Sequence, residues 1–124
     1  MEEFEMLHSN LKINGEKIPN EKELEKFFAS EHFTCEIGYN ALEVEYSEEG
    51  AAFIGWIGNE EEVYYFDNGS GNVEPVDLVI NVCPEERMMC YDDVVIKDIV
   101  FYFCETGERN PKYNWIEDDI GYEQ

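Results

Sequence analysis

A period of two in hydrophobicity, interrupted at short intervals by turn residues, runs through the chain from residue 33 to residue 69. In "LEVEYSEEG", residues 42–50, apolar side chains at alternate positions are separated by glutamates, the pattern of a strand with one buried and one solvated face. The segments 33–40, 51–58 and 62–69 are rich in aromatic and β-branched residues and are bounded by Gly or Asn. Strands that follow one another through short turns favour an antiparallel meander.

Three further signals extend this sheet. "VDLVINV", residues 76–82, reads as another strand. "YNWIE", residues 113–117, alternates like a short edge strand, and Asn14-Gly15 is a hairpin turn signal within residues 4–18. The sequence therefore predicts an antiparallel sheet of about five to six strands.

A first helix is predicted over residues 20–31, "NEKELEKFFASE". Asn20 is a good N-cap, and Glu23 follows three residues later, as in a capping box. The apolar face has spacings of three and four residues and consists of Leu24, Phe27 and Phe28.

A second helix is predicted over residues 92–107, "DDVVIKDIVFYFCETG". Asp92 or Asp93 caps it and carries a negative charge at the positive end of its dipole. Gly107 stands where a left-handed residue closes a last turn, and Pro111 forbids continuation. The apolar stripe consists of Val95, Ile96, Ile99 and Phe103, widened by Val100 and Cys104.

The chain has 124 residues, of which 44% are hydrophobic, and it has the size of one domain. We expect a single α+β domain over residues 1–124, with an antiparallel sheet flanked by two helices. "MEEFEMLHSN" lacks the features of a signal peptide, and no run approaches eighteen apolar residues. We therefore expect a cytoplasmic protein.

The cysteines and histidines show no metal-binding spacing. No C-x-x-C pair is present, and the two histidines are His8 and His32. We expect no metal and no cofactor, and interpret the cysteines as buried, reduced thiols. These are Cys35, Cys83, Cys90 and Cys104.

The net charge of −22 constrains the partners of the chain. An acidic surface repels nucleic acid and anionic membranes and attracts cations or a basic protein. The charge also exceeds the magnitude of about 2–8 that keeps a small domain soluble. Candidate partner-binding residues are therefore the clusters in predicted turns and the tail. They are Glu48, Glu49, Glu60, Glu61, Glu62, Asp67, Asn68, Glu117 and Asp118.

Taken alone, each of these acidic clusters is more simply interpreted as a solvent-exposed loop. Trp56, Tyr64 and Tyr113 are candidate aromatic anchors, but we expect at least two of these three in the core.

The stretch "FCETGERNPKYNW", residues 103–115, contains a helix stop, a turn and an aromatic residue that returns to the sheet. Gly107, Arg109, Pro111 and Trp115 form this motif, which shapes the C-terminal region whatever the function. We expect Trp115 to be largely buried against the last helix, because an indole offers a large area to a small core.

The same stretch resembles immunity protein family 1 of bacterial polymorphic toxin systems, whose last helix ends in a T-G-x-R-P-like element followed by a strand that carries Trp. "LEVEYSEEGAAFIGWIGNEEEVYYFDNG" resembles the central strands of that family, and the likeness covers roughly residues 20–117. One departure is that Asn110 stands between Arg109 and Pro111. The resemblance implies a cytoplasmic antidote that binds a cognate nuclease or deaminase toxin domain 1:1 and blocks its active site.

Two other classes of function are an enzyme and a nucleic-acid mimic. An enzyme is disfavoured because "GSG" at 69–71 lacks the Lys and helix of a phosphate-binding loop, and neither histidine stands beside a nucleophile motif. The alternative to an immunity protein is a nucleic-acid mimic that inhibits a DNA-binding enzyme. A mimic needs carboxylates spaced like phosphates along one extended face, whereas an immunity protein concentrates them around one epitope.

Overall fold

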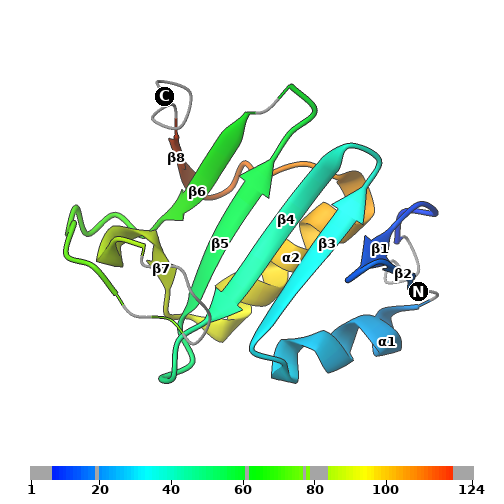
Figure 1. Ribbon diagram of the computed structural model, residues 1–124, viewed down its shortest axis with the longest axis horizontal. Helices are drawn as coiled ribbons and strands as arrows, with labels where there is room; N and C mark the ends of the chain where they lie inside the picture. The colour runs from blue at the N-terminus through cyan, green and yellow to red at the C-terminus, as the bar shows by residue number, and fades with distance from the viewer. Residues whose placement is uncertain (1–6, 19, 61, 77, 79–83, 119–124) are drawn as a thin grey trace.

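The computed structural model describes residues 7–18, 20–60, 62–76, 78 and 84–118 as one small α+β domain (Figure 1). An antiparallel sheet has the strand order β2-β1-β3-β4-β5-β6-β8, and β7 pairs with β5 beside this path. The strands are β1 Lys12–Ile13, β2 Glu16–Lys17, β3 His32–Ile37, β4 Asn40–Tyr46, β5 Ala52–Ile57, β6 Val63–Asp67, β7 Met89–Cys90 and β8 Asn114–Glu117. The helices are α1 Glu21–Glu25, α2 Asp93–Thr106 and the 3₁₀ segments η2 Lys26–Ala29 and η3 Glu86–Met88.

The predicted meander is confirmed, since β3, β4, β5 and β6 pair consecutively and antiparallel. The sheet has more strands than predicted, because β1, β2 and β7 have two residues each and are too short to show a period. In the strand predicted over 76–82, only Val76 and Leu78 are described. The Val76 N–H donates to the Pro84 carbonyl at 2.9 Å. Residues 77 and 79–82 lie outside the described residues.

Helix α2 covers one face of the sheet and forms the main core (Figure 1). The Asp92 side chain accepts from the Val94 N–H at 2.9 Å, and Gly107 ends the helix with a φ of +80°. The predicted stripe is buried at Ile96, Ile99, Val100, Phe103 and Cys104. This stripe packs against alternate residues of the central strands. Side chains repeat every 3.6 residues along the helix and every two residues along a strand, so one face of each is buried in the contact.

The first helix is shorter than predicted. Asn20 caps α1 by accepting from the Glu23 N–H at 3.0 Å, as predicted, but the chain tightens to a 3₁₀ turn at Lys26. Ser30 ends that 3₁₀ turn, because its hydroxyl donates to the Phe27 carbonyl at 2.6 Å and its N–H donates to the same oxygen at 3.0 Å. The two segments lie beside β3 (Figure 1). Phe27 and Phe28 of the 3₁₀ turn contact Phe33 of β3.

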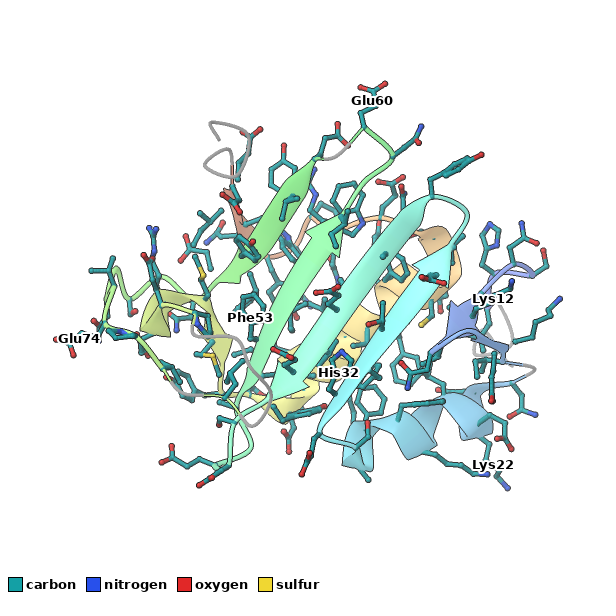
Figure 2. All side chains as sticks on the ribbon, viewed as in Figure 1. Lys12, Lys22, His32, Phe53, Glu60 and Glu74 are labelled. Carbon is teal, nitrogen blue, oxygen red and sulfur yellow. The ribbon has the colours of Figure 1, made fainter. Side chains whose placement is uncertain are left out.

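A second, smaller cluster lies on the opposite face of the sheet around Phe53 and Met89. Glu45 lies on this face and is only 6% exposed, although the alternation in β4 predicted a solvated glutamate. Its register partners are His32 on β3 and Phe53 on β5 (Figure 2). Period-two patterning sorts residues between two faces, but it does not show that part of the second face is covered as well.

Candidate functional site

The predicted acidic residues separate into two groups at opposite ends of the sheet. The turns before and after β5 lie at its two ends, and Glu60 marks one of them (Figures 1 and 2). The last residues of β6 lie at the same end of the sheet as the turn before β5, and we call this the Glu48 end. It contains Glu48, Glu49, Asp67 and Asn68. The other, which we call the Arg109 end, holds Glu60, Glu62, Glu117 and Asp118. Glu61 lies outside the described residues.

At the Arg109 end, Gly107 joins the last helix to the sheet. Its carbonyl oxygen accepts from Asn40 Nδ2 at 2.9 Å and from Trp56 Nε1 at 3.1 Å. Asn40 begins β4 and Trp56 lies in β5. The left-handed turn predicted at Gly107 therefore directs a carbonyl toward two donors on different strands.

Arg109 lies over two aromatic rings. Its Cζ atom is 3.6 Å from the ring centroid of Tyr64 and 4.9 Å from that of Trp56. Its Nε atom is buried and has no hydrogen-bond partner. Stacking on two rings stabilises a guanidinium by cation–π attraction, so this residue of the motif fastens the segment after α2 to β5 and β6.

Asn110, the residue that departs from the family pattern, holds the turn that follows. It is buried, and its carbonyl oxygen accepts from Trp115 Nε1 at 3.0 Å. Its side-chain oxygen accepts from the Lys112 N–H at 3.0 Å, and Pro111 is exposed. The extra residue is thus an integral part of the turn.

The aromatic residues near this motif are mostly structural. At least two of Trp56, Tyr64 and Tyr113 were expected in the core; Trp56 belongs to it, whereas Tyr64 and Tyr113 are partly buried and pack against it. Trp115 was predicted to be largely buried but is only partly so, because it lies on β8 at the edge of the sheet. Its ring meets Phe66 edge-on at 6.3 Å.

The carboxylates at the Arg109 end include one with an internal partner. Asp118 Oδ2 accepts from the Tyr65 hydroxyl at 2.9 Å, and the Asp118 N–H donates to the Val63 carbonyl at 2.8 Å. Tyr39, in the turn between β3 and β4, is 82% exposed.

The Glu48 end is organised around Tyr91, which is 60% exposed. The Tyr91 hydroxyl donates to Glu86 Oε2 at 2.7 Å, and the Ser70 hydroxyl donates to Glu86 Oε1 at 2.7 Å. These hydrogen bonds lower the pKa of Glu86. The bond to Glu86, together with burial and the nearby charges of Glu86 and Glu49, raises the pKa of Tyr91 to about 12.

Asp67 and Asn68 have mainly structural roles at this end. Asn68 Nδ2 donates to the carbonyl oxygens of Glu86 and Met89, both at 2.9 Å, and so holds the segment before α2 against β6. Asp67 Oδ1 accepts from the Gly69 N–H at 2.9 Å within the same turn. Their side chains shape the surface that the neighbouring glutamates form.

Sequence reasoning did not single out Tyr91, Glu31 or Asp93 as surface residues of one site. They come from three separate segments and meet near Glu48 only in the folded chain. For Glu31 the available signal was the meander itself, since alternate turns of a meander lie at the same end of the sheet. Tyr91 and Asp93 lie outside the meander, and the pattern gave no such signal for them.

The acidic charge is only partly neutralised. Three ion pairs lie within the described ranges, joining Lys26 to Glu23, Arg87 to Glu85 and Lys112 to Asp98. Lys12 and Lys22 lie on the side of the molecule formed by β1 and α1 (Figure 2). Much of the negative charge therefore faces solvent without a matching cation.

The cysteines that the structure describes are buried free thiols, as predicted: Cys35, Cys90 and Cys104. Cys83 lies outside the described residues. The sulfur atoms of Cys35 and Cys104 are 4.0 Å apart. The hydrogen bond from Cys104 and burial raise the pKa of Cys35, and burial raises that of Cys90. Such thiols react slowly, because the nucleophilic form is the thiolate.

Among the described residues, no group of three or more His, Cys, Asp or Glu side chains is placed to hold a metal ion. In the same part of the chain, no helix has the length and apolarity needed to cross a membrane. No family model, curated protein or solved structure matches this chain.

Proposed function

We propose that this protein is a cytoplasmic immunity protein that binds a basic toxin domain 1:1 and blocks its active site. The observation that carries this proposal is the gathering of carboxylates around Tyr91 at the Glu48 end. The two glutamates whose charges act on it, Glu49 and Glu86, come from segments almost forty residues apart. An exposed aromatic residue amid unneutralised acids suits an interface with a basic protein.

Electrostatic attraction explains why an acidic surface would bind such a toxin domain. A nuclease or a nucleic-acid deaminase tracks phosphates with a basic groove, and a carboxylate surface is complementary to that groove. Long-range attraction raises association rates to about 10⁸–10⁹ M⁻¹s⁻¹. Rapid capture protects a cell in which free toxin turns over its substrate.

The terminal motif supports the proposal through the resemblance. Gly107, Arg109 and Trp115 each contact another part of the sheet or of the turn. The motif and the central strands that carry the likeness are therefore joined in one structural unit. The motif accounts for the shape of the domain, while the carboxylates account for recognition.

The test is binding to the toxin domain that we expect to be encoded immediately upstream. We expect the purified proteins to form a 1:1 complex in light scattering at 0.15 M salt, and coexpression of this chain to restore growth. A second acidic protein of similar net charge and size serves as control for nonspecific attraction. The proposal fails if the toxin domain remains active and unbound at micromolar concentrations of this protein, or if the control protects equally.

A further inference from the structure

Two cavities lie side by side at the Glu48 end and share Ser47 and Glu48 in their walls. The first has a volume of about 420 Å³ and lies between the end of η2, the turn after β4 and the first turns of α2. We call it the helix-side pocket. The second has a volume of about 360 Å³ and lies between the same turn and the residues Val76, Leu78, Met89 and Tyr91. We call it the strand-side pocket.

The helix-side pocket combines an apolar interior with an acidic rim. Phe28, Tyr46 and Ile96 line it and are buried or half-buried. Burial is the main cause that raises the pKa of Tyr46 to about 12, so its ring remains neutral at physiological pH. The exposed lining residues include three carboxylates, namely Glu31, Glu48 and Asp93.

One cation also lines the helix-side pocket. The Lys97 ammonium lies 5.5 Å from the centroid of the Phe28 ring. The chain thus already places one cation over an aromatic ring at the wall of this cavity. Three carboxylates outweigh that single positive charge, so the pocket remains attractive to a second cation.

The strand-side pocket also has both apolar and acidic lining residues. Its apolar lining consists of Ala51, Val76, Leu78 and Met89. Its exposed rim carries Glu48, Glu49 and Tyr91, and its described lining includes no Lys or Arg. Glu48 stands between the two pockets and contributes its charge to both.

We infer that these two pockets receive two basic side chains, arginine or lysine, from the partner protein, one on each side of Glu48. Both side chains have an apolar stem and a charged head, which match the apolar lining residues and the carboxylate rim of each pocket. Arginine also stacks on aromatic faces such as that of Tyr91. This inference rests on the proposed function and specifies which surface of the immunity protein meets the toxin.

The Arg109 end is less suited to such a partner. There the guanidinium of Arg109 already lies over Tyr64 and Trp56. An incoming cation would meet its positive charge, whereas at the strand-side pocket Tyr91 is exposed and hydrogen-bonded to a carboxylate. Neutralising the same number of carboxylates at each end should therefore weaken binding to different extents.

The decisive comparison uses two fourfold variants with the same change of charge. The first neutralises the pockets with Glu31→Gln, Glu48→Gln, Glu49→Gln and Asp93→Asn. The second neutralises the other end with Glu60→Gln, Glu62→Gln, Glu108→Gln and Glu117→Gln. Calorimetric titration of each with the toxin domain at 0.15 M salt gives Kd.

We expect the pocket variant to bind about 100-fold more weakly and the control variant to lose less than about threefold, because contacts at an interface outweigh remote charges. Glu48→Gln alone should have the largest single effect, about tenfold, since Glu48 lines both pockets. Equal losses in the two fourfold variants, or a loss only in the control, would overturn the inference while the proposed function stands. If wild-type protein does not bind the toxin domain, the proposed function fails and this inference fails with it.

A second measurement uses the unmodified protein and does not depend on the folding of variants. A carbodiimide that joins carboxylates to amines is added to the complex, and the cross-links are mapped by mass spectrometry. We expect cross-links from Glu31, Glu48, Glu49 or Asp93 to lysines of the toxin domain. Cross-links confined to Glu60, Glu62 and Glu117 would place the interface at the Arg109 end and refute the inference.

Discussion

The carbonyl oxygen of Gly107 accepts a hydrogen bond from Trp56 Nε1 at 3.1 Å, which joins the end of α2 to the middle of the sheet. This bond exists because Gly107 has a φ of +80°, where the chain turns back and its carbonyl faces β5. Replacing Gly107 with Ala should destabilise the protein by about 1–2 kcal/mol, since a Cβ disfavours the left-handed region. The free energy of urea unfolding measures the loss.

Sterics contribute little to this effect. A Cβ at Gly107 would lie 3.6 Å from a side-chain carbon of Ile37, an ordinary contact. Gly107→Asn should therefore cost less than Gly107→Ala, because Asn tolerates the left-handed conformation better. If the two variants are equally unstable, backbone conformation is not the cause.

The two tryptophans should differ in their contributions to stability. Trp56 is 4% exposed, so Trp56→Ala should cost about 3–5 kcal/mol. Trp115 is only partly buried, and Trp115→Ala should cost less, about 2–3 kcal/mol. Urea unfolding of both variants tests the order, and a larger loss at Trp115 would show that β8 contributes more to the core than its burial indicates.

The buried carboxyl of Glu45 should make stability depend on pH. Burial raises its pKa above the ordinary value of 4.5; the charge of Glu43 adds to the increase, and that of His32 opposes it. A raised folded-state pKa means that the folded state binds the proton more tightly, so this contribution is present at low pH and is lost as pH rises through the folded-state pKa. One oxygen, Oε1, has no hydrogen-bond partner, which adds to the cost of the ionised form.

Glu45→Gln removes this titration. We expect the variant to gain stability relative to wild type as pH rises from 4.5 toward neutrality, reaching about 1 kcal/mol. Glu36→Gln, at an exposed position on β3, is the control for a general loss of negative charge. Unfolding at several pH values decides the matter, and a constant difference between Glu45→Gln and wild type would exclude Glu45 as the titrating group.

Salt should stabilise the free protein. A charge of −22 with three ion pairs in the described residues leaves strong self-repulsion, and physiological salt screens it over a Debye length of about 8 Å. We expect the Tm to rise from low salt to 0.15 M NaCl, as measured by circular dichroism. A flat or falling Tm would show that self-repulsion contributes little to stability.

Local patterns were sufficient to predict α2 and the central strands of the domain. Asp92 and Gly107 delimit α2 as expected, because capping depends on the side chain and backbone of the residues at the helix ends. The alternation in 42–46 predicted β4 for a similar reason, since successive side chains of a strand point to opposite faces. The motif after α2 could likewise be recognised as a helix stop followed by a strand.

Contacts between segments that are distant in the sequence could be identified only from the tertiary structure. The position of Arg109 over Tyr64 depends on how α2 docks on the sheet, and the burial of Glu45 depends on a cluster that covers part of the second face. The two pockets beside Glu48 join side chains from η2, the turn after β4, the segment before α2 and α2 itself. Sequence patterns report the neighbours of a residue along the chain, whereas charge complementarity and burial depend on its neighbours in space.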